Sequence, residues 1–118
     1  MTVEYFDGVR AAMGDKATGD SVRLYMVPGM QHCGGGPGAT SFGQSGDGVR
    51  GDAEHDVFTA LEEWVEKGKA PGTIVGERVG SEKKVEFTRP LCAYPKEARY
   101  VKGDQGDAGS FACVAPGK

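Results

Sequence analysis

The sequence lacks the features that direct a chain to a membrane or to nucleic acid. No apolar run approaches the roughly 20 residues needed to cross a bilayer. The 14 Lys and Arg residues are outnumbered by 17 Asp and Glu, so the formal net charge is -3 and no cationic surface is expected to attract nucleic acid or anionic lipid. The opening stretch MTVEYFDGVR has no apolar segment or cleavage site of a signal peptide. We therefore expect no membrane partner, no nucleic-acid partner and no export signal in this chain.

The composition also leaves little room for regular secondary structure, and the cysteines cannot all pair within the chain. With 118 residues, the chain has room for one small domain, and its 20 glycines and 6 prolines predict much loop. Its three cysteines are an odd number, which in an oxidised protein leaves one thiol without a partner inside the chain.

Hydrophobic spacing predicts a helix and then a buried strand in the first 30 residues. The stretch TVEYFDGVRAAMG repeats its apolar residues at helical spacing, with Thr2 as a candidate cap and Gly14 as its end. A polar linker over residues 15–20 is expected to follow. The run SVRLYMV, Ser21 to Val27, then suits a core strand that ends at Pro28 and Gly29.

The second half predicts one more helix and two short strands. The helix lies in DAEHDVFTALEEWVEKG and ends at Gly68, with a glycine-rich loop over residues 34–52 before it. TIVGERV and KKVEFTR resemble strands, and the sequence after them predicts an irregular tail clipped by cysteines. The apolar stripe of the helix, for which we expect core packing, consists of Val57, Phe58, Leu61, Trp64 and Val65.

The motif VPGMQHCGGGPG, Val27 to Gly38, is the first candidate for chemistry because it places His32 on a loop after the predicted strand. Imidazole titrates near neutrality and serves as a general base and acid. A loop histidine can equally be structural or merely exposed. Cys33 suits a disulfide that fixes the position of its neighbour, and a buried free thiol is the alternative.

Metal and cofactor sites are not predicted. His32, Cys33 and His55 lack the paired spacing of zinc ligands, and we interpret His55 as a surface residue in the first turn of the second helix. Asp104 and Asp107 lack the pattern of a calcium loop, so a solvated turn is the better interpretation.

Arg89 is expected to make a local salt bridge or to support the tail.

Four stretches resemble a known family in both order and spacing. RLYMVPGMQHCGGGPG, LEEWVEKGKAPGTIV, TRPLCAYPKEARYVKG and FACV are similar to the C-terminal end of the tannase and feruloyl esterase family of secreted serine hydrolases. The resemblance begins at VEYFDGVRAAMG and covers nearly the whole chain. It implies an α/β fold, that of an α/β-hydrolase, and a Ser-His-Asp triad that cleaves esters of phenolic acids.

The resemblance also implies roles for individual residues. His32 matches the catalytic histidine of the family. Cys33 matches a cysteine that bonds to the residue before the nucleophilic serine, so its partner would lie outside this chain. Cys92 and Cys113 match a pair expected to bridge within the tail. No serine here has the surroundings of the nucleophile, and the candidates that fail are Ser21, Ser41, Ser45, Ser81 and Ser110.

These departures lead to one main expectation and one alternative. Residues 1–118 are expected to form a partial α/β-hydrolase domain that supplies the histidine segment of a secreted or periplasmic phenolic esterase, without the nucleophile, the triad acid or the lid. Its substrate would be a phenolic ester, bound only once the domain is complete, and no cofactor is expected. The alternative is a small, non-catalytic interaction protein. Because the neighbouring strands are absent, we expect the apolar faces of the two helices to be covered by formation of a homodimer or by pairing of strand edges.

Overall fold

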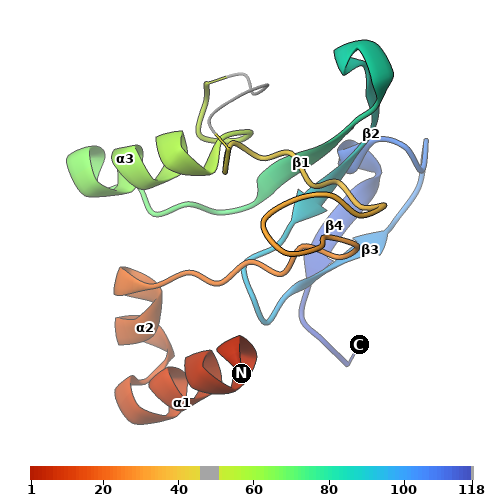
Figure 1. The fold of residues 1–118 in the computed structure, drawn as a ribbon. Helices are drawn as coiled ribbons and strands as arrows, with labels where there is room; N and C mark the ends of the chain where they lie inside the picture. Colours follow the sequence, from red (N-terminus) through yellow and green to blue (C-terminus); the bar gives the residue numbers. More distant parts are fainter. Residues whose placement is uncertain (46–50, 118) are drawn as a thin grey trace.

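The computed structural model describes residues 1–45 and 51–117, which form a small fold of mixed helices and strands. Figure 1 shows the first two helices together at one end and the third helix beside a long hairpin. Within the described ranges, no helix has the length and apolar character required to cross a membrane. The elements in chain order are α1 (Thr2–Met13), α2 (Asp15–Ser21), α3 (Val57–Lys67), β1 (Ile74–Val79), β2 (Val85–Leu91), β3 (Glu97–Tyr100) and β4 (Phe111–Val114).

The first predicted helix is confirmed as α1, although little of its apolar stripe is buried. It begins at Thr2, with Met1 rather than Thr2 in the capping position, and it ends before Gly14. Phe6 is buried and meets the ring of Tyr94 edge-on, with ring centroids 5.8 Å apart. Tyr5 is 76% exposed. Tyr94 holds the helix through this aromatic pair and through its hydroxyl, which donates to Asp7 at 3.2 Å.

The predicted linker and core strand are both wrong. Residues Asp15–Ser21 form α2, in which the buried Thr18 donates its hydroxyl to the Gly14 carbonyl at 2.7 Å. The chain then becomes extended at Val22, but its pairing with another extended segment, among the described residues, is limited to an isolated bridge between Tyr25 and Ala93. A run of strand-forming residues without a partner to receive its hydrogen bonds does not make a strand.

The helix predicted from the most periodic part of the sequence is confirmed as α3. Asp56 caps α3 by accepting from the Phe58 and Thr59 amides at 2.9 and 3.4 Å, and Gly68 ends it in the left-handed conformation. The stripe expected in the core largely faces outward. Ala60, 2% exposed, forms the core with Ile74 and Leu91, and of the predicted stripe Val57 packs against this core.

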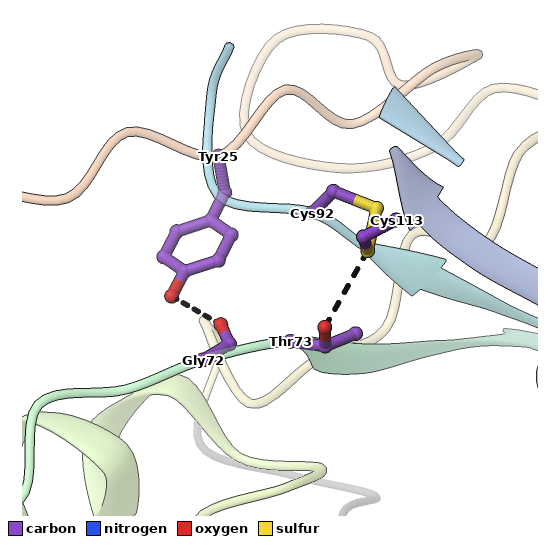
Figure 2. The surroundings of a disulfide bond; sticks show 5 residues. All are labelled: Tyr25, Gly72, Thr73, Cys92 and Cys113. Atoms are coloured by element: carbon purple, nitrogen blue, oxygen red, sulfur yellow. Dashed lines mark hydrogen bonds between the residues drawn. A yellow bond between two sulfur atoms is a disulfide. The ribbon is translucent and has the colours of Figure 1, made fainter. Parts of the chain in front are cut away.

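The two predicted strands and the cysteine-clipped tail are present, but the tail is more regular than expected. β1 and β2 form an antiparallel hairpin, with Ile74 opposite Leu91. β3 and β4 pair in the same manner, with Glu97 opposite Val114, where the sequence predicted irregular structure. Figure 2 shows the Cys92–Cys113 disulfide that joins the end of β2 to β4. The covalent link gives the two short tail strands a fixed place beside the hairpin.

Candidate functional site

The segment that leads into the histidine loop is held between two distant parts of the chain. The Tyr94 amide donates to the Leu24 carbonyl at 2.7 Å. The Tyr25 hydroxyl donates to the Gly72 carbonyl at 2.6 Å, as Figure 2 shows, and burial raises the pKa of that hydroxyl. Tyr25 therefore fixes the segment that enters the loop to the segment before β1, close to the disulfide. We call this entering segment the outgoing limb of the loop.

The glycines of the loop allow its backbone to fold back on itself. The Gly38 amide donates to the Gly29 carbonyl at 3.1 Å, which closes the stem. A Cβ atom at Gly38 would overlap the carbonyl oxygen of Pro28, and one at Gly36 would overlap that of Gly29. Glycine is required at both positions because the two limbs touch through their backbones. Close backbone packing thus explains Gly36 and Gly38, whereas a Cβ atom at Gly34 would meet nothing within 4 Å.

His32 lies at the tip of this closed loop with an exposed side chain. The tip is closed by the Gln31 amide, which donates to the Gly35 carbonyl at 3.1 Å. The Cys33 Sγ atom lies 3.1 Å from Nδ1 of His32, and Cys33 is a free, exposed cysteine with a φ of 66°. The sharp turn at Cys33 lets two adjacent side chains meet. An imidazole presented in this way can exchange protons with a group brought to it from outside the loop.

Within the part of the chain that the structure describes, His32 is brought to Cys33 but not to an acid or a nucleophile. In the ranges 1–45 and 51–117, no serine or carboxylate hydrogen-bonds to His32. No group of three or more potential metal ligands gathers anywhere in those ranges. Among the residues that the structure describes, the histidine that the resemblance implies as the base is therefore not hydrogen-bonded to a candidate acid or nucleophile.

His55 differs from its predicted surface position. It precedes α3, and its side chain is only 14% exposed. Its Nδ1 lies 2.8 Å from Oδ1 of Asp52, and this hydrogen bond is the main reason that the pKa of Asp52 lies below its usual value. We infer a structural role for His55, because it orders the turn that leads into α3.

The remaining candidates have local structural roles. The Arg89 guanidinium stacks on the rings of Phe87 and Phe111, 4.8 and 4.6 Å from their centroids. Of the two roles predicted for Arg89, this contact matches the support of the tail. Asp104 and Asp107 each accept a backbone amide in tight turns, from Gly106 at 2.8 Å and Gly109 at 3.0 Å.

Sequence patterns missed two residues that fix the histidine loop. The sequence places Tyr25 only in a predicted core strand and Arg78 only in a predicted short strand. The Arg78 guanidinium donates to the Gly36 carbonyl. Neither contact has a sequence signal, because both partners are backbone carbonyls more than 40 residues away.

Similarity to proteins of known structure and sequence identifies the class of fold. The chain superposes on feruloyl esterase B from Aspergillus oryzae with a TM-score of 0.86 and 29% identity, over 96% of this chain and 23% of that one. An uncharacterized esterase of Xanthomonas campestris is 45% identical over 98 residues, 78% of this chain and 17% of its own. A mono(2-hydroxyethyl) terephthalate hydrolase of Piscinibacter sakaiensis is 40% identical over 118 residues, 98% of this chain and 17% of its own. The fold is one found in carboxylic ester hydrolases.

The family model described as tannase and feruloyl esterase matches residues 1–114. The chain belongs to the tannase and feruloyl esterase family, as its motifs predicted. It spans less than a fifth of the length of the two curated relatives named above.

Proposed function

We propose that this chain supplies the catalytic histidine segment of a serine-type carboxylic ester hydrolase that acts on phenolic esters. The observation that carries the proposal is the position of His32 at the exposed tip of a loop that is closed by backbone contacts and fixed at both limbs. A general base needs an accessible ring on a rigid support. In this proposal, residues 1–118 form the last part of an α/β-hydrolase domain.

The roles in the reaction follow from the chemistry of a triad. His32 takes the proton from a serine hydroxyl as that oxygen attacks the ester carbonyl, and then returns it to the leaving alcohol. The serine and the acid come from a part of the enzyme outside this chain. Cys33 holds His32 near the nucleophile through a disulfide to that part.

Two further observations support the substrate class and the compartment. The family name includes feruloyl esters, and one relative is named for a terephthalate ester, so aromatic acids are the acyl groups we propose. The Cys92–Cys113 disulfide favours an oxidising compartment, either outside the cell or in a periplasm.

The test is a chimera in which this chain replaces the matching C-terminal part of feruloyl esterase B from Aspergillus oryzae. Hydrolysis of a chromogenic ferulate ester is measured for the chimera, for His32→Ala and for His55→Gln, which removes the other imidazole. We expect His32→Ala to lower kcat by a factor on the order of 10³ or more, while His55→Gln keeps most of the activity. Equal activity of the parent chimera and His32→Ala would refute the role of His32.

A second candidate function is a non-catalytic interaction protein, favoured by the apolar residues that α3 exposes. Phe58, Leu61 and Val65 are 56%, 52% and 78% exposed and lie on one face of the helix. A chain that does not restore turnover in the chimera but binds another protein through this face would fit this candidate instead.

A further inference from the structure

The return limb of the histidine loop, residues 36–41, lies against β1. The Ser41 amide donates to the Glu77 carbonyl at 3.0 Å, and the Glu77 amide donates back to the Ser41 carbonyl at 2.8 Å. A Cβ atom at Gly76 would lie 2.6 Å from the Ala39 carbonyl oxygen, so the two backbones pass closely there as well. β1 is therefore the rigid support of this limb.

Among the contacts between β1 and the return limb, the one made by Arg78 lies nearest to the tip of the loop. Its Nη1 donates to the Gly36 carbonyl, four residues beyond His32 in sequence. Its Nε lies 3.6 Å from Oε1 of Glu86, which stands on the neighbouring strand of the hairpin. The Arg78 side chain is 31% exposed, and so it is partly shielded from solvent. A planar guanidinium can hold a carbonyl and a carboxylate at the same time.

We propose that Arg78 is a positioning residue that sets the location of His32 for catalysis. The residues between Cys33 and Pro37 are all glycine, so no side chain packs to fix this part of the loop. Glycine backbone is also the most costly to order. A hydrogen bond from a charged donor is roughly twice as strong as a neutral one, so the Arg78 contact at Gly36 is a strong restraint on this glycine run, beside the bond between the Gln31 amide and the Gly35 carbonyl. The proposed catalytic role rests on the function proposed above for His32.

A purely structural role for Arg78, that of joining β1 to β2 through Glu86, makes a different prediction. Loss of that role would loosen the hairpin as a whole. Loss of the positioning role would loosen the loop and leave the hairpin unchanged. The two roles can be separated because Glu86→Gln removes the ion pair and retains the bond to Gly36.

The first experiment measures amide hydrogen exchange in the 118-residue chain. The loop amides are those of Gln31 and Gly38, and the reference amides are those of Gly80 and Thr88 in the hairpin, bonded to the carbonyls of Lys84 and Gly106. We expect Arg78→Gln to raise exchange at the loop amides about tenfold relative to the reference amides. Arg78→Lys should restore part of the protection, because it keeps a charged donor.

Two controls complete the exchange experiment. Glu86→Gln should leave the loop amides within about threefold of the parent, and so should Arg99→Gln, which removes an exposed arginine from β3. The proposal is overturned if Arg78→Gln leaves loop exchange unchanged, or if it raises exchange equally at the loop and reference amides.

The second experiment measures kinetics of the same variants in the esterase chimera. Arg78→Gln should lower kcat about tenfold or more and change KM less than twofold, because the loop misplaces the base without altering substrate binding. Arg99→Gln should match the parent. An unchanged kcat for Arg78→Gln would overturn the catalytic part of the proposal. If the parent chimera itself is inactive, the function proposed above fails, and the exchange measurements still decide whether Arg78 positions the loop.

Discussion

The thiol of Cys33 and the imidazole of His32 are in contact, with Sγ 3.1 Å from Nδ1. In a serine esterase triad, Nδ1 of the histidine faces the carboxylate and Nε2 faces the nucleophile. A free thiol at Cys33 thus contacts Nδ1, the ring nitrogen that would face the carboxylate of a triad. The disulfide that we propose for Cys33 would remove the thiol proton. It would also leave Nδ1 available to a carboxylate.

The first prediction follows from this contact. Cys33→Ala removes the group beside Nδ1, so we expect the ¹⁵N resonance of His32 Nδ1 to shift, because the proton distribution between the two ring nitrogens changes. His55 is an internal control, since its Nδ1 is bound to Asp52 and should not respond. An unchanged His32 spectrum would show that the thiol does not engage the ring in solution.

The second prediction concerns the stem of the loop. Gly38→Ala places a methyl group against the Pro28 carbonyl and should destabilise the fold by about 2 kcal/mol. Gly34→Ala is the matched control, because a Cβ there meets nothing within 4 Å, and its effect should stay within about 0.5 kcal/mol. Urea unfolding of the three proteins checks this. Similar stabilities for the two variants would mean that the limbs do not pack as closely as the structure shows.

The third prediction concerns the disulfide in the tail. The Cys92–Cys113 bond closes a loop with a sequence separation of 21. Replacing both cysteines by alanine should lower the free energy of unfolding by about 3 kcal/mol, because the unfolded chain regains the freedom that the cross-link removes. Cys33→Ala removes the unpaired cysteine and serves as the control. A loss below about 1 kcal/mol in the double variant would indicate that β3 and β4 hold without the bond.

The fourth prediction concerns pH. The hydrogen bond from His55 lowers the pKa of Asp52 below its ordinary value of 3.8. A lowered pKa in the folded state means that the contact stabilises the protein above about pH 3.8, and that this contribution is lost as the pH falls through the folded value. Asp52→Asn should therefore lower the Tm at pH 6 and have a smaller effect near pH 2.5.

The matched control for the fourth prediction is the same substitution in a His55→Gln background. Without the imidazole, the main cause of the lowered pKa is absent. The pH dependence of the Asp52→Asn effect should then shrink. The same pH dependence in both backgrounds would contradict the assignment of the shift to His55.

The sequence predicted the elements whose signal is local. Helix α3 has a regular apolar period and a glycine at its end, and β1 and β2 have strand-forming residues on both sides of a turn. The motif around His32, together with the three stretches that follow it, indicated the family. Each of these stretches is recognised from residues that are close together in the sequence.

The sequence did not predict what depends on distant partners. Ser21 to Val27 has the composition of a strand, but the described chain offers it only the bridge at Tyr25. Residues Glu97–Tyr100 were not predicted as a strand, and they form β3 by pairing with β4, whose Cys113 is bonded to Cys92. Arg78 was missed for the same reason, since its acceptor at Gly36 is 42 residues away.

The last prediction concerns the exposed face of α3. Phe58 and Leu61 lie on this face, although their spacing predicted core positions, and Ala60 on the opposite side fills the core instead. Exposed apolar groups on one face favour association, so we expect the chain to form a homodimer at micromolar concentration. Sedimentation velocity should show the dimer for the parent and for Glu66→Gln, and a monomer for Leu61→Gln. A parent chain that remains monomeric, with a sharp unfolding transition independent of concentration, would refute the dimer, because nothing would then have to cover this face.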